Sequence, residues 1–209
     1  MKKGKLLLSF ALMSAIVMTG YSQNFKEVKI GNQIWMTENL NVDKFRNGDT
    51  IQQVKDATAW KIAGEKRQPA WCYYKNDPAN GTKYGKLYNW FAVSDPRGLA
   101  PKGWHIPMEW GPLTDYLGGE YAAGMQLKST SGWYDNGNGN NKSGFNGLPA
   151  GNRDYKGVFS GIGDLAYWWS SINQGSLAAD IRMLSYRHAK ITKGVTNMAD
   201  GISVRCIKD

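Results

Sequence analysis

The first apolar stretch of the chain has the pattern of an export signal and not of a folded domain. Three lysines within the first five residues precede the apolar run Leu6–Met18, and small and polar residues follow as far as Gln23. This order is typical of a secretory signal peptide. The run has about 13 residues, fewer than the roughly 17–25 that span a bilayer as a helix, which favours cleavage over anchoring. We therefore expect residues 1–23 to be a signal peptide and residues 24–209 to form the exported domain.

The mature part of the chain begins with β patterning. Apolar residues flank Gly31-Asn32 within Phe25–Met36, and a glycine-first turn of two residues predicts a hairpin there. The stretch Asn39–Pro69 is polar and mixed, with Trp60 as its one large apolar anchor, and predicts a long surface excursion. Trp71–Tyr74 follows as a short aromatic strand.

Two helices are predicted in the middle of the chain. Apolar residues at three- and four-residue spacing predict a helix over Tyr84–Val93, directly after a loop at Asn76–Gly81. A second helix is predicted over Trp110–Leu117, with Pro112 in its first turn and Gly118-Gly119 as its end.

Helical periodicity stops at Lys128, and short apolar pieces then alternate with segments rich in Asn, Gly and Ser. The best strands are Tyr167–Trp169, Ala179–Leu184 and Ile202–Ile207. Trp168 and Trp169 should point to opposite faces of their strand, so that at least one of them is in the core. The order of a hairpin, two helices and then strands with long loops predicts a single α+β domain.

Composition and charge narrow the function classes. The chain has 9 Trp, 11 Tyr and 6 Phe, which require a core or a contact surface. Its net charge of +9 falls to +6 when the three signal lysines are removed, and the remaining basic residues are dispersed. Nucleic acid is therefore not an expected partner. After the signal, no segment is apolar enough to span a membrane, and the oligomeric state is left open.

The two cysteines leave two interpretations open. Cys72 and Cys206 are an even pair in a chain expected to reach an oxidising compartment, which permits a disulfide. The alternation of Ile202–Ile207 turns Cys206 inward, where a thiol is either a bridge partner or a small buried apolar group.

Candidate catalytic residues are few. We expect His105 to be packed in the core and His188 to be exposed. The segment Gly157–Gly161 misses the spacing of a serine nucleophile elbow. No Cys/His cluster for zinc and no phosphate-binding glycine loop is apparent. We expect a protein that is not an enzyme and that holds no metal or cofactor.

The segment Trp133–Tyr155 is the strongest candidate for a ligand site. It combines aromatic rings with amide and charged groups in a stretch too rich in glycine to be core throughout. An aromatic ring can cover the C–H face of a sugar while polar groups bond its hydroxyls. The alternative is a solvated loop whose rings close the core. The candidate ligand-binding residues are Trp133, Tyr134, Asp135, Asn136, Asn152, Arg153 and Tyr155.

Seven ordered segments resemble one protein family over nearly all of the mature chain. They are Gly31–Asn41 (GNQIWMTENLN), Trp71–Tyr74 (WCYY), Tyr84–Trp90 (YGKLYNW), Gly103–Pro107 (GWHIP), Gly144–Gly151 (GFNGLPAG), Tyr167–Ser171 (YWWSS) and Ser203–Cys206 (SVRC). Together they resemble the Fibrobacter succinogenes major paralogous domain.

That resemblance implies a fold distantly similar to formylglycine-generating enzymes and C-type lectins. It implies two short helices, a mostly antiparallel sheet and long irregular loops. The copper-binding pair of close cysteines that the enzymes use has no counterpart, since Cys72 and Cys206 lie far apart in the sequence. The calcium motifs of the lectins are also missing. The expectation is an exported, non-catalytic domain that binds a glycan or a cell-surface partner through its loops. The alternatives are an adhesive or structural envelope component and an enzyme of the related fold.

Overall fold

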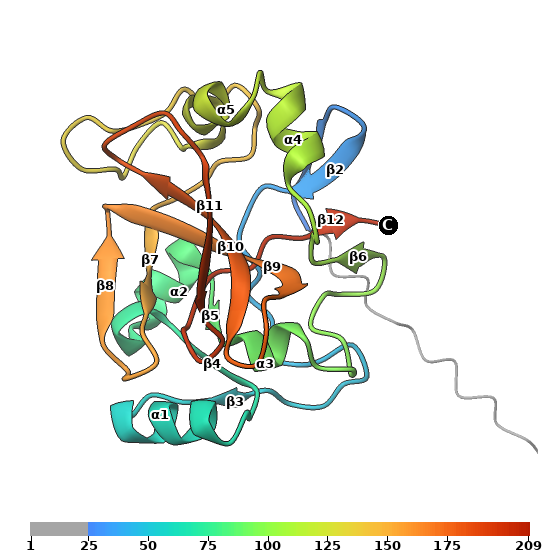
Figure 1. The fold of residues 1–209 in the computed structure, drawn as a ribbon, viewed down its shortest axis with the longest axis vertical. Coiled ribbons are helices and arrows are strands. Elements are labelled where there is room, and N and C mark those ends of the chain that lie inside the picture. The colour runs from blue at the N-terminus through green and yellow to red at the C-terminus, as the bar shows by residue number, and fades with distance from the viewer. Residues whose placement is uncertain (1–24) are drawn as a thin grey trace, which may run out of the picture.

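The computed structural model describes residues 25–209, so the predicted signal peptide lies outside the described residues. The described chain is a mixed α+β fold (Figure 1). Its helices are α1 (Ala57–Glu65), α2 (Pro78–Tyr84), α3 (Trp90–Val93), α4 (Gly111–Tyr116) and α5 (Glu120–Leu127), with a 3-10 turn η1 (Tyr74–Asn76). Its strands are β1 (Glu27–Ile30), β2 (Gln33–Met36), β3 (Gln52–Gln53), β4 (Ala70–Cys72), β5 (Leu87–Tyr88), β6 (Trp104–His105), β7 (Ala150–Arg153), β8 (Phe159–Ile162), β9 (Leu165–Asn173), β10 (Ala178–Ser185), β11 (Thr192–Asn197) and β12 (Ile207–Lys208).

The strands form four small sheets. All of the strand pairings are antiparallel except that of β3 with β4, which is parallel. The strand orders of the sheets are β1-β2-β12-β6, β11-β10-β9, β3-β4-β5 and β7-β8. Figure 1 shows α4 and α5 at one end of the molecule and α1 at the other, with the longest strands between them. The predicted α+β class is therefore confirmed.

The predicted hairpin is present as β1 and β2. Val28 faces Trp35 and Ile30 faces Gln33 across the pair. Gly31 opens the turn at φ +60°, a backbone conformation that side chains disfavour. The glycine-first turn was thus a sound basis for this prediction.

The helix predicted over Tyr84–Val93 is wrong for most of its length, and only its end is helical, as α3 (Trp90–Val93). Helix α2 occupies the residues predicted as a loop, because Asp77 accepts a hydrogen bond from the backbone N–H of Ala79 and Pro78 fits the first helical position. Gly85 ends α2 at φ +77°, and the chain continues as β5. The Asp-Pro pair marked a helix start and not a turn.

The described residues contain five helices, where two were predicted. Helix α4 is the predicted second helix, and Gly118 and Gly119 end it at φ +90° and +91°. Helix α5 was missed because small residues make up most of its buried face. An added Cβ on Gly124 would lie 2.1 Å from the carbonyl oxygen of Ala189, so only glycine allows this close approach. Helix α1 falls within the predicted excursion and buries Trp60.

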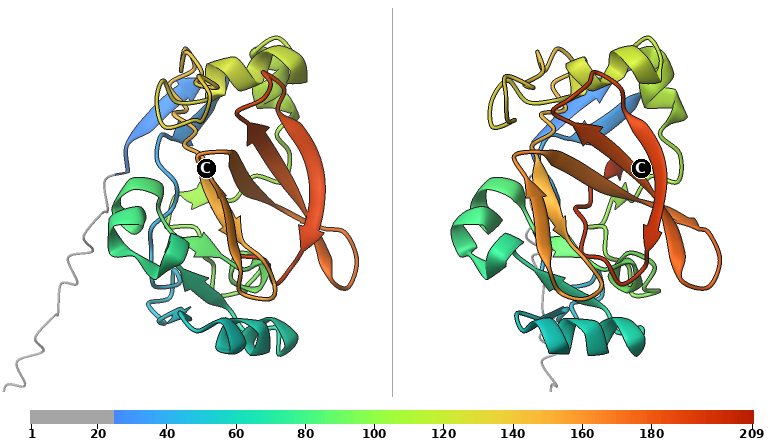
Figure 2. Two further views of the ribbon diagram at one scale, coloured as in Figure 1. Left: turned by 90° about the vertical axis from the view of Figure 1, so that its left-hand side faces the viewer. Right: turned by 60° about the vertical axis from the view of Figure 1, so that its left-hand side comes forward.

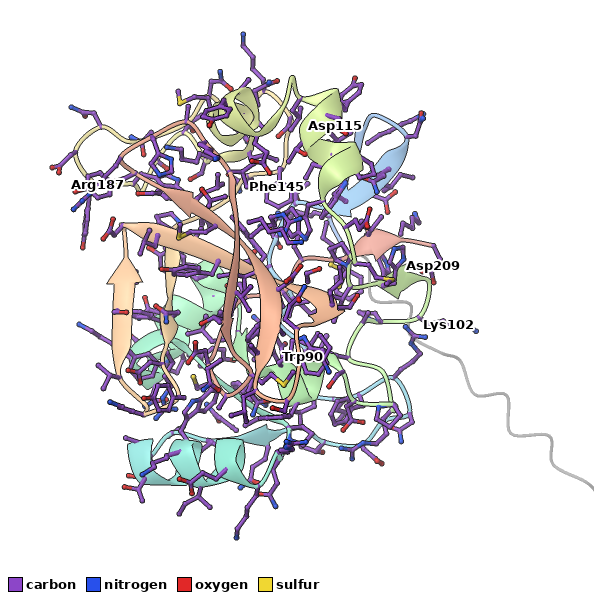
Figure 3. All side chains as sticks on the ribbon, in the orientation of Figure 1. Trp90, Lys102, Asp115, Phe145, Arg187 and Asp209 are labelled. Atoms are coloured by element: carbon purple, nitrogen blue, oxygen red, sulfur yellow. The ribbon has the colours of Figure 1, made fainter. Side chains whose placement is uncertain are left out.

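The core is divided by β9. Trp168 packs against Trp110 and Phe145, with ring centroids 5.9 and 5.4 Å apart, on one face. Trp169 faces the other side, where its indole N–H donates to the Tyr88 carbonyl at 2.8 Å. Both tryptophans are fully buried, so the alternation was predicted correctly and each face covers its own core. Figure 3 shows Phe145 inside the molecule.

The C-terminal segment does not alternate as predicted. Residues 201–207 are all buried, and only Ile207–Lys208 forms a regular strand. Single bridges join Ile202 to Tyr88 and Ser203 to Trp168. The segment therefore runs through the interior between the two core faces, which explains why its polar members are buried as well.

A buried lysine fixes the long loops at the end of α5. The ammonium of Lys128 donates to the carbonyls of Gly137, Ser185 and His188 at 2.9 to 3.0 Å. Burial lowers the pKa of Lys128. Three carbonyl oxygens thus replace water around the charge and tie the loop after α5 to the end of β10.

Candidate functional site

The structure separates the residues of the predicted loop site. Trp133 is buried, and its indole N–H donates to the Ser129 hydroxyl at 3.1 Å and the Gly147 carbonyl at 3.2 Å. The ring therefore closes the core beneath the loop and is not available to stack on a ligand, as the alternative interpretation held.

Arg153 is also buried and serves the fold. Its guanidinium donates to the carbonyls of Val54, Lys55 and Gly157 at 2.7 to 3.2 Å. It also lies 4.6 Å from the ring centroid of Trp60. Arg153 thus joins β7 to the chain before α1, and it is not among the residues that line the two pockets described below.

Tyr134, Asp135 and Asn136 lie together on the surface. Asp135 and Asn136 adopt φ values of +45° and +57°, and the N–H of Gly137 closes their turn on the Tyr134 carbonyl. The exposed Tyr134 ring covers Gly163 in the turn between β8 and β9. This sequence thus forms a turn in which Asp and Asn tolerate the left-handed backbone.

Tyr155 lies at the opposite end of the β7–β8 hairpin. Its turn packs against α1, where an added Cβ on Gly157 would lie 2.8 Å from Ala57. Asn152 lies on β7 and accepts a hydrogen bond from the Ser160 hydroxyl at 3.0 Å. Figure 2 shows one hairpin end facing α1 and the other facing the loop after α5. The candidate residues therefore form no single site.

The two cysteines are free thiols, so the possible disulfide is not formed. Cys72 packs with Trp60 and Leu87, whereas Cys206 belongs to a separate cluster around Trp169. Burial raises the pKa of each thiol to about 12. At neutral pH both groups are protonated and act as small apolar side chains.

His105 is exposed, which corrects the prediction of a core role. Its Nδ1 lies 2.8 Å from a carboxylate oxygen of Asp209 at the molecular surface, where Figure 3 labels Asp209. It points outward because β6 is an edge strand whose alternate residue, Trp104, faces the core. His188 is exposed, as predicted.

Two adjoining pockets occur on the segment Thr37–Val42. Three backbone hydrogen bonds hold its neighbourhood extended: Met36 N–H to the Cys206 carbonyl, Leu40 N–H to the Val204 carbonyl, and Lys86 N–H to the Leu40 carbonyl. The segment therefore runs between the C-terminal strand region and the end of α2.

We name the pockets after one residue of each. The Phe25 pocket has a volume of about 190 Å³ and is lined by Phe25, Lys26, Met36, Glu38, Asn39, Asn41 and Val42. The Asn146 pocket has a volume of about 120 Å³ and is lined by Thr37, Glu38, Asn39, Asn41, Gly81, Thr82, Lys83, Gly85, Asn146, Leu148 and Arg205. The pockets share Glu38, Asn39 and Asn41 and thus form one polar surface with two hollows.

Asn39 is fixed between the pockets by its own hydrogen bonds. Its side-chain oxygen accepts from the Trp168 indole at 2.8 Å and from Nε and Nη2 of Arg205 at 3.1 and 2.7 Å. Its amide nitrogen donates to the Tyr84 carbonyl at 2.9 Å. Asn39 is thereby held in place between the two pockets. Both polar atoms of its side chain are already hydrogen-bonded within the protein.

Arg205 forms part of the lining of the Asn146 pocket from below. Its Nη1 donates to the carbonyls of Met36 and Phe145, and its guanidinium carbon lies 4.3 Å from the Phe145 ring centroid. No carboxylate of the described residues forms an ion pair with it. Burial lowers the pKa of Arg205 to about 9, so the group stays charged at neutral pH.

Lys86 supports the pockets from the other side. Its ammonium donates to the backbone carbonyl and the side-chain oxygen of Asn41 at 2.8 and 2.9 Å. It lies 4.3 Å from the ring centroid of Trp71, and burial lowers its pKa. A second cation is thus held close beneath the pocket surface.

The polar groups that can still form hydrogen bonds lie at the rim of the Asn146 pocket. The side-chain amide of Asn146 forms no hydrogen bond within residues 25–209, although its backbone N–H donates to Asn141. Thr37 is half-buried, and Thr82 and Lys83 are exposed. Beside them, Phe25 offers a half-buried ring that packs edge-on against Trp104. Hydroxyl, amide and ammonium groups beside a ring can bind a polar ligand with an apolar face.

The sequence patterns do not reveal this surface, although the seven family segments contain most of its residues. Glu38, Asn39 and Asn41 come from the first of the seven segments, Asn146 from the fifth and Arg205 from the last. The available signal was the position of polar residues within otherwise apolar segments. Those residues converge only in the fold, since β2, α2 and the C-terminal segment meet there.

Residues 25–209 contain no group of three or more His, Cys, Asp or Glu side chains that would hold a metal ion. Within the same part of the chain, none of the helices has the length and apolar character that crossing a membrane requires.

The structure is thus an α+β domain with two adjoining polar pockets at its surface. The buried cations Lys86, Lys128 and Arg205 donate hydrogen bonds to carbonyl oxygens. The chain belongs to the Fibrobacter succinogenes major domain family, whose model matches residues 28–208. This confirms the resemblance seen in the seven segments. No curated protein and no solved structure matches the chain.

Proposed function

We propose that the protein is an exported, non-catalytic recognition domain that binds a glycan in the two pockets along Thr37–Val42. The observation that carries this proposal is the proximity of a half-buried aromatic ring, Phe25, to the side-chain amide of Asn146 and the hydroxyl of Thr37, neither of which forms a hydrogen bond within residues 25–209. A ring covers the C–H face of a sugar, and the polar groups bond its hydroxyls.

The two pockets lie outside the segment Trp133–Tyr155 except for Asn146 and Leu148 at the rim. Trp133 and Arg153 have structural roles there, and Tyr134 and Tyr155 lie at opposite ends of a hairpin. Export rests on the pattern of residues 1–23, and the relation to the C-type-lectin-like fold rests on the family resemblance.

The thiols support a role without catalysis. Since burial raises the pKa of Cys72 and Cys206 to about 12, neither is a thiolate that attacks a substrate or binds copper at neutral pH. The two imidazoles also lie at exposed positions on different segments. An adhesive envelope component would use the same recognition surface and would differ in its partner.

A panel of neutral and acidic oligosaccharides, titrated into the protein by calorimetry, tests the proposal. We expect binding by at least one glycan, weakened at least fivefold by Asn146→Gly. Asn146 has φ +56°, which glycine tolerates, so this change removes the amide without straining the backbone.

Asn136→Gly is the matched control. Asn136 has φ +57° and lies in the segment Trp133–Tyr155, which the sequence pattern favours as a ligand site. We expect its affinity to equal that of the wild type. If Asn136→Gly weakens binding and Asn146→Gly does not, the ligand occupies the loop and the proposed site is wrong. If no glycan of the panel binds, the proposed function itself is wrong.

A further inference from the structure

The Asn146 pocket contains a cation with an unused hydrogen-bond donor. A guanidinium carries five N–H groups. Four of those of Arg205 are accounted for: Nε and one Nη2 hydrogen donate to Asn39, and Nη1 donates to the carbonyls of Met36 and Phe145. The second Nη2 hydrogen has no acceptor within residues 25–209. Arg205 is 1% exposed and belongs to the lining of this pocket.

A buried charge without a counter-charge is unusual. Buried ions are normally paired, because neutral acceptors replace only part of the solvation that water gave. Arg205 has carbonyl and amide oxygens around it but no ion pair among the described residues. Burial lowers the pKa of Arg205, and the charge of Glu38 raises it only from beyond ion-pair distance. An anion in the pocket would therefore complete both the hydrogen bonding and the charge balance of this group.

The charges around the Asn146 pocket also favour an anionic ligand. Lys83 is exposed at the rim, and Lys86 lies behind Asn41. Glu38 is the one acidic residue in the lining, and its carboxylate forms an ion pair with Lys26 at 2.7 Å. Positive charge is thus in excess, which attracts an anionic group of a ligand.

The two pockets differ in size and lining. The Asn146 pocket, at about 120 Å³, has room for a carboxylate and the carbon that bears it. The adjoining Phe25 pocket, at about 190 Å³, has more space and an aromatic wall for the ring itself.

We propose that the Asn146 pocket is a carboxylate subsite, in which Nη2 of Arg205 and the amide of Asn146 bind the carboxylate of a hexuronic acid residue. The inference rests on the proposed function and specifies its ligand as an acidic glycan. Sulfated sugars present an anion with similar hydrogen-bonding chemistry, so the experiment separates the two sources.

The test compares trisaccharides that differ in one substituent. The probes are a trigalacturonate, its neutral galactose counterpart and the 6-sulfated counterpart, each titrated at low and at physiological salt. We expect the trigalacturonate to bind at least tenfold more tightly than the neutral probe and more tightly than the sulfated probe. Its affinity should fall as salt is raised.

Two variants link that preference to the pocket. Lys83→Met removes an exposed rim charge without touching the core, and we expect two- to fivefold weaker binding of the trigalacturonate and a smaller loss of affinity for the neutral probe. Arg205→Lys should abolish the tenfold preference while Nζ keeps part of the hydrogen bonding to Asn39. The thermal unfolding midpoint of each variant checks that it is folded, and a preference that survives Lys83→Met at full strength contradicts the rim's role.

The outcomes separate this inference from the proposed function. Equal affinity for the acidic and neutral probes overturns the carboxylate subsite and leaves glycan recognition standing. Tighter binding of the sulfated probe also overturns it. If none of the three probes binds while a peptide with a free C-terminal carboxylate does, the proposed glycan recognition and the assignment of a hexuronic acid to the subsite are both wrong.

Discussion

Replacing Asn39 with alanine should destabilise the protein more than any comparable change at a half-buried amide. The side-chain oxygen accepts from Trp168 and twice from Arg205, and the side-chain nitrogen donates to Tyr84. The variant leaves an indole donor and two guanidinium donors without acceptors in the interior.

The magnitude follows from those contacts. A buried donor left without a partner costs about 1–3 kcal/mol, and hydrogen bonds to charged groups are at the upper end. Three such donors lose their acceptor in this variant, and two of them belong to a buried charge. We expect Asn39→Ala to lower the free energy of unfolding by about 3–5 kcal/mol, a large part of the roughly 5–15 kcal/mol of a typical domain.

Urea unfolding followed by tryptophan fluorescence measures this loss. With a slope of about 2 kcal/mol per M, the midpoint should fall by roughly 2 M. Asn39→Asp keeps oxygen acceptors beside Arg205 and should recover at least half of the loss at neutral pH.

Asn152→Ala is the control for Asn39→Ala. Asn152 is half-buried and accepts one hydrogen bond, from Ser160, so we expect a loss of at most about 1 kcal/mol. A loss below about 1 kcal/mol for Asn39→Ala, or equal losses for the two variants, would refute the view that Asn39 organises the interior around Arg205.

The remaining predictions concern the thiols, the close approach at α5 and the buried lysine. Cys72 and Cys206 should not react with a thiol reagent in the native protein and should both react after denaturation without reductant; a disulfide would leave both silent. Because their pKa values are raised to about 12, the native state keeps protons that the unfolded chain loses above about pH 9. Their stabilising contribution is therefore complete below pH 9 and lost as pH rises toward 12, which pH-dependent unfolding would show. Gly124→Ala should cost at least about 2 kcal/mol, because the new Cβ meets the Ala189 carbonyl, whereas Gly111→Ala, in open space at the start of α4, should be neutral or slightly stabilising. Lys128→Ala should cost about 2–4 kcal/mol and speed hydrogen exchange around Gly137; exchange unchanged there would show that the ammonium does not hold the loop.

The parts of the fold that were predicted correctly depend on local chemistry. Gly31-Asn32 dictates a turn whatever surrounds it, and Gly118-Gly119 ends α4 for the same reason. The alternation of Trp168 and Trp169 was correct because neighbouring residues of any strand face opposite sides.

The parts that were missed depend on tertiary contacts. Helix α5 buries small residues, so its apolar pattern is weak, and the fit of Gly124 against Ala189 exists only after folding. The C-terminal segment is buried on both sides because Tyr88 and Trp168 bridge it from opposite directions. The pattern of apolar residues along the sequence does not indicate that a segment is buried on both sides.

The candidate site shows the same division. Aromatic and amide residues close together in sequence, such as Tyr134 and Tyr155, were separated by the four-residue strands of one hairpin. Residues far apart in sequence, such as Asn39, Asn146 and Arg205, were brought together. Burial of a cation without an acidic partner is a property of the folded environment, and composition gives no sign of it.

A map of amide chemical-shift changes, recorded by nuclear magnetic resonance while a galacturonate oligosaccharide is added, examines the claim of recognition at the two pockets most directly. The largest changes should fall on residues 37–42, 81–85 and 146–148, with the side-chain amide of Asn146 among them. Changes confined to residues 133–136 and 154–158, or a spectrum that does not change at millimolar ligand, would contradict it.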